Sequence, residues 1–202
     1  MKLKIDSNIV ENYKTAFAAG ILIGFGVIIN STIFNPIIGS LFFSFGLLVI
    51  IALKLPLYTG RIGFVNRNDY PGMLISNLIG VMTTMIIYVL AKPSFISVIT
   101  DTSQVKFSKT FIEMFLFAIL CGILIHFAVK IKEYPVTVLS IAIFILIGAE
   151  HCIADFPFLI FNFSIINFIK WVLVVIGNSL GAIFAEYITT ENKDEICSNN
   201  SK

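Results

Sequence analysis

The interpretation of this chain depends on one ten-residue stretch, Gly148-Ala149-Glu150-His151-Cys152-Ile153-Ala154-Asp155-Phe156-Pro157. The stretch places three ionisable side chains, Glu150, His151 and Asp155, inside an apolar run that extends over residues 135–161. A charge at the centre of a bilayer costs roughly 3 kcal/mol or more, so ionisable residues at that depth mark a functional path. The run is also longer than the about 20 residues that a straight helix needs to cross a membrane. The sequence therefore predicts a broken membrane-spanning helix that carries a functional site.

The composition of the whole chain indicates a lipid environment. Of its 202 residues, 57% are apolar and only 13% are charged, and the mean hydropathy is +0.95. Soluble domains are about 45–50% apolar and about 25% charged. So few charges exclude a soluble enzyme, and a net charge of +2 gives no reason to expect a nucleic-acid partner. We expect an integral membrane protein whose surface contacts lipid.

Long charge-free runs predict an all-α membrane protein with six transmembrane helices. Residues 15–53 carry no charge and are too long for one crossing, and turn signals at residues 30–32 and at Asn35-Pro36 divide them in two. The expected spans are 15–33, 36–57, 71–91, 107–129, one that begins near Pro135, and 165–187. Together they form a single channel domain, residues 15–189. A cytoplasmic N-terminal segment, 1–14, and a polar cytoplasmic tail, 190–202, flank it.

The distribution of basic residues predicts the orientation in the membrane. Six crossings place both termini on one side, and cytoplasmic segments carry the excess of Lys and Arg. That side would hold nine basic residues, Lys2, Lys4, Lys14, Arg61, Arg67, Lys130, Lys132, Lys193 and Lys202. The other side would hold four, Lys92, Lys106, Lys109 and Lys170. We therefore expect cytoplasmic termini in an inner membrane, with Tyr134 and Trp171 at the height of the membrane interface.

The two halves of the chain share a pattern that predicts inverted repeats. Each half has three spans, and the middle span is interrupted, near residues 55–63 and again near 148–157. The third span of each half carries an Asn-x-x-Gly sequence, Asn77 to Gly80 and Asn178 to Gly181. Because three is odd, the halves must have opposite orientations, and interrupted helices at matching places in inverted repeats indicate a transport path near the midplane.

Several motifs, in order along nearly the whole chain, resemble those of the formate/nitrite transporter family. The stretch 148–154 is similar to the signature Gly-x-Glu-His-x-x-Ala of that family. Other matches are the glycine pattern of residues 18–26, Phe43-Ser44-Phe45-Gly46-Leu47, Leu57-Tyr58-Thr59-Gly60, Lys106 with residues 109–113 of the fourth helix, and residues 176–181. The resemblance implies an aquaporin-like fold of two inverted three-helix repeats with helices 2 and 5 broken. It also implies a homopentamer with one pore per protomer.

The resemblance further implies permeation of small monovalent anions or their acids, such as formate, nitrite or hydrosulfide. Because a bare anion pays a desolvation cost of order 20 kcal/mol at a dry apolar constriction, we expect a proton to neutralise it near the histidine. His151 would be the central pore histidine, and Thr59 would form a hydrogen bond near it. The side chains Phe43, Leu47, Leu57 and Phe144 would line apolar constrictions, and Lys106 would attract anions in the outer vestibule. Asn77, Asn178, Glu150, Asp155 and Lys54 would support the pore structurally.

The chain departs from the family at four positions. Lys54 and Pro56 replace a small residue and an acid before the first break, and Gly122 and Asp155 stand where the family has asparagines. Because the two broken spans should meet at the pore, we expect Lys54 to pair with Asp155. Glu150 is expected to tie the second break to a neighbouring helix.

Two other classes of function are compatible with the residues. An intramembrane enzyme would use Glu150, His151 and Asp155, but the chain has no His-Glu-x-x-His or Gly-x-Ser-x-Gly sequence. A non-conducting relative would have a sensing or structural role. An aquaporin is excluded, because the only Asn-Pro lies in a turn at residues 35 and 36. The three cysteines form no CxxC pair, so we expect no disulfide, metal or cofactor.

Overall fold

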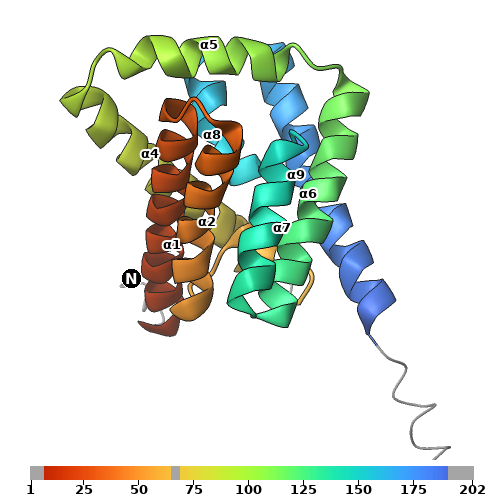
Figure 1. Ribbon diagram of the computed structural model, residues 1–202. Coiled ribbons are helices and arrows are strands. Elements are labelled where there is room, and N and C mark those ends of the chain that lie inside the picture. Colours follow the sequence, from red (N-terminus) through yellow and green to blue (C-terminus); the bar gives the residue numbers. More distant parts are fainter. Residues whose placement is uncertain (1–6, 65–68, 191–202) are drawn as a thin grey trace, which may run out of the picture.

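The computed structural model describes residues 7–64 and 69–190, and this part of the chain is helical (Figure 1). The helices are α1 (Ser7–Thr32), α2 (Pro36–Ala52), α3 (Tyr58–Arg61), α4 (Tyr70–Ala91), α5 (Phe95–Phe107), α6 (Phe111–Ile131), α7 (Tyr134–Leu146), α8 (Cys152–Phe161) and α9 (Ile165–Thr189). Helix α1 packs along α4, α6 packs along α9, and α2 and α7 pack against each other between these pairs. The expectation of an all-α protein is confirmed.

Within the described residues, four helices are long and apolar enough to cross a membrane, namely Asn12–Thr32 within α1, α4, α6 and α9. Their outward faces expose large apolar side chains, for example Leu90 at 76% and Ile112 at 71%. In water this surface would be strongly unfavourable, whereas in a bilayer it contacts hydrocarbon. The chain is therefore an integral membrane protein.

Helix α5 was not expected from the sequence. It lies across one end of the bundle, opposite the end at which α1 begins (Figure 1). Its buried residues Phe95, Ile99, Ser103 and Phe107 recur every four positions and face the bundle. The Ser103 hydroxyl donates a 2.7 Å hydrogen bond to the carbonyl of Phe158 in α8, which holds α5 against the second broken segment.

The boundaries of several expected segments differ from those observed. The fourth span was expected from residue 107, but α6 begins at Phe111, where Thr110 and Glu113 form a capping box. Lys106 therefore belongs to α5 and not to the fourth spanning helix. Helix α1 begins at Ser7, inside the segment 1–14 that was expected to precede the membrane domain. Residues 1–6 and nearly all of the expected tail, 191–202, lie outside the described residues.

Both broken helices end in the same backbone motif. After α2, the Lys54 N–H donates to Ile51 O and the Leu55 N–H donates to Ile50 O, with Lys54 at φ 56°. After α7, the equivalent donors are the N–H groups of Gly148 and Ala149, with Gly148 at φ 72°. This is the Schellman C-cap, whose left-handed position favours glycine. Lys54 and Gly148 are thus equivalent in the two halves, and the breaks span residues 53–57 and 147–151.

One buried asparagine holds each break in place. Asn77 in α4 accepts a 2.9 Å hydrogen bond from the Tyr58 N–H, and its amide donates to the carbonyls of Pro56 and Ala16 at 3.0 and 2.7 Å. Asn178 in α9 repeats the pattern. It accepts from the Cys152 N–H at 2.9 Å and donates to the carbonyls of Glu150 and Ala118, each at 2.8 Å. Both side chains are fully buried. Each amide therefore satisfies backbone groups that the break has removed from helical hydrogen bonding.

Glycines allow the helices of each half to approach closely around these asparagines. A Cβ on Gly20 of α1 would lie 2.1 Å from Asn77 O, and a Cβ on Gly122 of α6 would lie 2.2 Å from Asn178 O. The obstacle is backbone in both cases and cannot move aside. The asparagine that the family has at position 122 therefore has no space here, and the close packing of α6 on α9 requires glycine.

Candidate functional site

The imidazole of His151 lies where the second break leads into α8. His151 is the N-cap of that helix, and its Nδ1 accepts a 3.1 Å hydrogen bond from the Ala154 N–H. Its Nε2 lies 2.9 Å from Thr59 Oγ1. Because Nδ1 accepts a bond from a backbone donor, the ring proton is assigned to Nε2, which donates to the Thr59 hydroxyl. In this geometry His151 is neutral.

Apolar side chains enclose the imidazole. Phe43 of α2 and Phe144 of α7 meet edge to face with their ring centres 5.8 Å apart, and the ring of Phe144 lies 6.1 Å from that of His151. Leu47 and Leu57 are each 1% exposed. All four side chains that were expected to form constrictions are therefore buried in the core. Of these four, Phe144 lies next to the His151 ring and Phe43 lies next to Phe144.

A cavity of about 250 Å³ reaches these residues from the end of the bundle that α5 covers. We call it the α5-side cavity. Its inner lining includes Phe43, Phe144, His151 and Asp155, and Lys106 and Lys109 also line it. With about 30 Å³ for each molecule of liquid water, it has room for several small polar molecules.

A second cavity, of about 430 Å³, opens toward the end of the bundle where the termini lie. We call it the terminus-side cavity. Leu57 and Gly60 line it, together with four cationic residues, Lys54, Arg61, Lys130 and Lys132. The two cavities have no lining residue in common. The hydrogen bond from His151 to Thr59 therefore connects the wall of the α5-side cavity to the segment that borders the other cavity.

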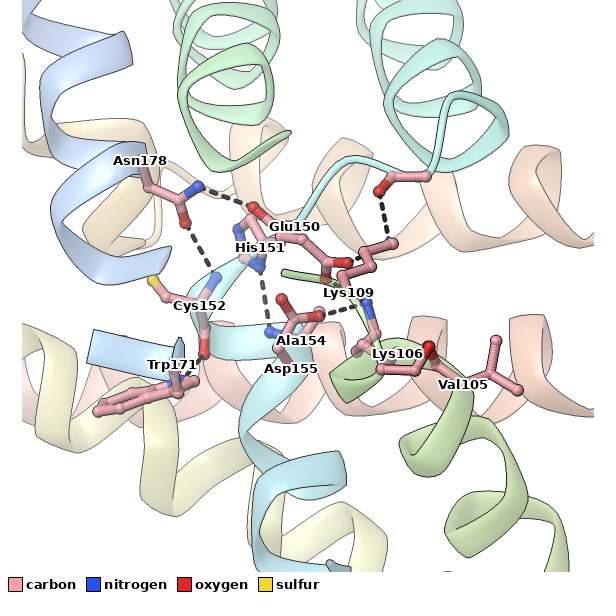
Figure 2. Close-up of polar contacts among 12 residues, drawn as sticks. Val105, Lys106, Lys109, Glu150, His151, Cys152, Ala154, Asp155, Trp171 and Asn178 are labelled. Carbon is pink, nitrogen blue, oxygen red and sulfur yellow. Dashed lines mark hydrogen bonds and ion pairs between the residues drawn. The ribbon is translucent and has the colours of Figure 1, made fainter. Parts of the chain in front are cut away.

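Four charged residues form a buried cluster beside the imidazole (Figure 2). Both oxygens of the Glu150 carboxylate are paired, Oε2 with Lys106 and Oε1 with Lys109. The Lys106 ammonium also contacts Asp155 Oδ1 at 2.9 Å. Glu150 and Asp155 are 0% and 2% exposed, so these charges are largely removed from water. Each buried carboxyl group lies against at least one ammonium group, as burial of charge requires.

The structure places Lys54 away from this cluster and corrects the expectation that it pairs with Asp155. Lys54 follows α2, its side chain is exposed and lines the terminus-side cavity, and its carbonyl accepts a 3.1 Å hydrogen bond from Arg61. Asp155 lies on the other side of the break and pairs with Lys106. The two breaks meet through Thr59 and His151. Lys54 lines the cavity on one side of this contact and Asp155 lines the cavity on the other side, so the two side chains do not meet.

Two further residues have roles that the sequence did not reveal. Lys109, expected only to help set the orientation, also donates to the carbonyl of Gly148 at 3.1 Å and so fixes the start of the second break. Trp171, expected at the membrane interface, is buried, and its Nε1 donates a 2.7 Å hydrogen bond to the carbonyl of Cys152. A lysine three residues after Lys106, and a lone tryptophan in an apolar helix, carry no signal that distinguishes these roles from surface roles.

Comparisons with known proteins identify the fold. No protein-family model and no curated protein sequence matches the chain. A solved structure described as a pentameric formate channel with formate bound has a TM-score of 0.71 and 21% sequence identity, over 92% of this chain and 95% of that one. A structure described as an FNT family ion channel has a TM-score of 0.80 and 18% identity, over 91% and 92% of the two chains. The chain therefore has the fold of these channels along nearly its whole length.

Proposed function

We propose that this chain belongs to the formate/nitrite transporter family and is a membrane channel for small monovalent anions or their acids, of the formate, nitrite and hydrosulfide class. The observation that carries the proposal is the hydrogen bond between His151 and Thr59, which lies between two cavities that approach it from opposite ends. The fold shared with two channel structures supports it.

The enclosed site requires that a permeating anion be neutralised. The ideal cost of moving a carboxylate-sized ion from water into a dry, low-dielectric medium is of order 20 kcal/mol. Phe43 and Phe144 place apolar rings beside His151, where they offer an anion no hydrogen bonds to replace those of water. A proton that travels with the anion removes the cost. In the proposed mechanism the anion enters a cavity, is protonated near His151 and passes the imidazole as a neutral acid.

The matched contacts of the two halves support the inverted-repeat architecture that we propose for the domain. Three features correspond between the first and second halves. They are the asparagines that hold the breaks (Asn77 and Asn178), the glycines that pack against them (Gly20 and Gly122), and the Schellman C-caps. We extend the proposal to a homopentamer, which the shared fold with a structure described as a pentameric formate channel supports. We also place the termini in the cytoplasm, as the basic lining of the terminus-side cavity favours.

Stopped-flow uptake by proteoliposomes tests the function directly. Vesicles with and without the purified protein are mixed with formate, nitrite or hydrosulfide across a range of pH, and entry is recorded. We expect at least one of these anions to enter protein-containing vesicles faster than empty vesicles. Equal rates for all three would contradict the proposal.

Two histidine variants connect the flux to the site. His151→Asn removes the ring and should lower the flux and change its pH dependence. His126→Asn is the matched control, because His126 is equally buried but lines neither cavity. If both variants retain the wild-type flux and pH dependence, His151 has no part in permeation.

A further inference from the structure

One oxygen of Asp155 is buried without a hydrogen-bond partner. Asp155 is 2% exposed and lines the α5-side cavity, and its Oδ1 contacts the Lys106 ammonium at 2.9 Å. Its Oδ2 has almost no exposed surface and has no hydrogen-bond partner among the described residues. Figure 2 shows this second oxygen turned away from Lys106. An unsatisfied carboxylate oxygen in such a place is costly, unless a proton or a ligand satisfies it.

No neighbouring charged group donates a hydrogen bond to this oxygen, and a proton on the Asp155 carboxyl group can be shared with Glu150. Lys106, from α5, contacts Asp155 through Oδ1, and Lys109, from the segment between α5 and α6, is committed to Glu150 and to a backbone carbonyl. Glu150 presents a second carboxylate, which accepts hydrogen bonds and cannot donate one when ionised. The remaining titratable groups nearby are the buried thiols Cys121 of α6 and Cys152 of α8, with the imidazole of His151 beside them.

His151 itself has no free position for a transferable proton. Its Nδ1 accepts from the Ala154 N–H, and its Nε2–H donates to Thr59. A second proton on Nδ1 would oppose the backbone N–H and remove the N-cap of α8. Among the polar side chains that line the α5-side cavity beside His151, the Asp155 carboxyl group is therefore the one available to hold an exchangeable proton.

We propose that the Asp155 carboxyl group, whose Oδ2 has no hydrogen-bond partner, exchanges a proton with the permeating anion, an inference that rests on the proposed function. An anion that enters the α5-side cavity takes the proton from the Asp155 carboxyl group. The O–H bond of Asp155 breaks, an O–H or S–H bond forms on the permeant, and the neutral acid moves past His151. The resulting carboxylate is stabilised by Lys106, and hydronium from the water of the vestibule restores its proton.

Asp155→Asn tests this step, because the amide has the same shape but no exchangeable acid. Formate uptake by proteoliposomes is measured between about pH 5 and about pH 7. Without a proton donor in the cavity, entry is limited to formic acid already formed in bulk, whose concentration falls about tenfold per pH unit. The variant should follow this slope, whereas the wild type should fall by less than about threefold per unit. At about pH 7 the variant should be slower by about tenfold or more.

Asp101→Asn is the matched control, since Asp101 is an exposed carboxylate on the same helix α5 as Lys106 and does not line the cavity. It should retain the wild-type slope. A merely structural role of Asp155 would lower the flux by the same factor at every pH, and that result overturns the inference. Asp155→Ser, which also lacks the acid, provides the same comparison if the asparagine variant does not fold.

The failure of this inference is distinguishable from the failure of the proposed function. If wild-type protein conducts formate and Asp155→Asn retains its shallow pH slope, the proton exchange at Asp155 is wrong and the channel function stands. If wild-type vesicles take up formate no faster than empty ones, both proposals are overturned.

Discussion

Thr59 and His151 are 92 residues apart in the sequence, and Thr59 Oγ1 lies 2.9 Å from His151 Nε2. Thr59 belongs to α3, directly after the first break, and His151 ends the second break. The bond therefore joins the two interrupted helices at their interruptions. Every step of the proposed permeation takes place at or beside this junction.

Removal of the Thr59 hydroxyl should impair the junction. In Thr59→Val the His151 Nε2–H loses its acceptor, and a buried donor without a partner costs about 1–3 kcal/mol. We expect formate flux in proteoliposomes to fall by about tenfold or more. Thr59→Ser retains the hydroxyl and should keep most of the flux. Retained flux in Thr59→Val together with a loss in Thr59→Ser would show that the methyl group, and not the hydrogen bond, matters.

The buried asparagines Asn77 and Asn178 should contribute more to stability than Asn35, which caps the N-terminus of α2 at the surface. Asn178→Ala leaves the Cys152 N–H and the Glu150 carbonyl without this partner inside the core, and removes a further bond to the helical Ala118 carbonyl. We therefore expect a loss of about 2–4 kcal/mol and a clearly lower melting temperature in detergent. Asn77→Ala should show a similar loss, because its contacts are equivalent. Asn35 also receives two backbone hydrogen bonds, but in an exposed N-cap, and Asn35→Ala should cost only about 1 kcal/mol. Equal losses in all three variants would refute this ranking.

Gly122→Ala should separate α6 from α9. The added methyl would lie 2.2 Å from the backbone oxygen of Asn178, and overpacking typically costs about 1–3 kcal/mol even where side chains can adjust. We expect a cost at or above the upper end of that range, measured as a fall in thermal stability. Gly72→Ala is the control, because its methyl meets only the distal ring atoms of Tyr13, which is 39% exposed and able to move.

Double-mutant cycles should distinguish the ion pair that forms from the one that does not. Lys106→Met combined with Asp155→Asn should show a coupling free energy above about 1 kcal/mol, because the two side chains share a buried contact. Lys54→Met combined with Asp155→Asn should show less than about 0.5 kcal/mol, since the two residues line different cavities. Thermal unfolding of the four proteins of each cycle measures both values, and strong coupling to Lys54 would contradict the structure.

Lys54→Gly should stabilise the protein or leave it unchanged. Lys54 has φ 56° at the position that Gly148 occupies in the second half, and a side chain in this conformation costs about 1 kcal/mol. The gain should be of that size, reduced by the greater flexibility of glycine in the unfolded chain. A marked loss of thermal stability would show that the Lys54 side chain makes contacts that support the break.

Much of the architecture was predictable because it depends on local properties of the sequence. Apolar runs of spanning length predicted α1, α4, α6 and α9, and Pro56 and the polar stretch at residues 148–157 marked the interrupted helices. Helix α5 was missed, because its short run of 13 residues contains both polar and apolar side chains and is too short to span a bilayer. Its amphipathic pattern becomes informative only when the bundle end that it covers is known.

The sequence by itself determined that the chain lies in lipid and where its two helices break, since composition and interruption are properties of short segments. It also supplied the candidate residues Thr59, His151, Glu150 and Asp155. Only the tertiary structure decided which of these residues meet. Attraction between charges depends on distance after packing, and no local pattern shows that Lys106 and Lys109 reach Glu150 while Lys54 lies on the far side of the junction. The same packing leaves Asp155 Oδ2 without a partner at the wall of the α5-side cavity, and this directs the proposed proton exchange to the Asp155 carboxyl group.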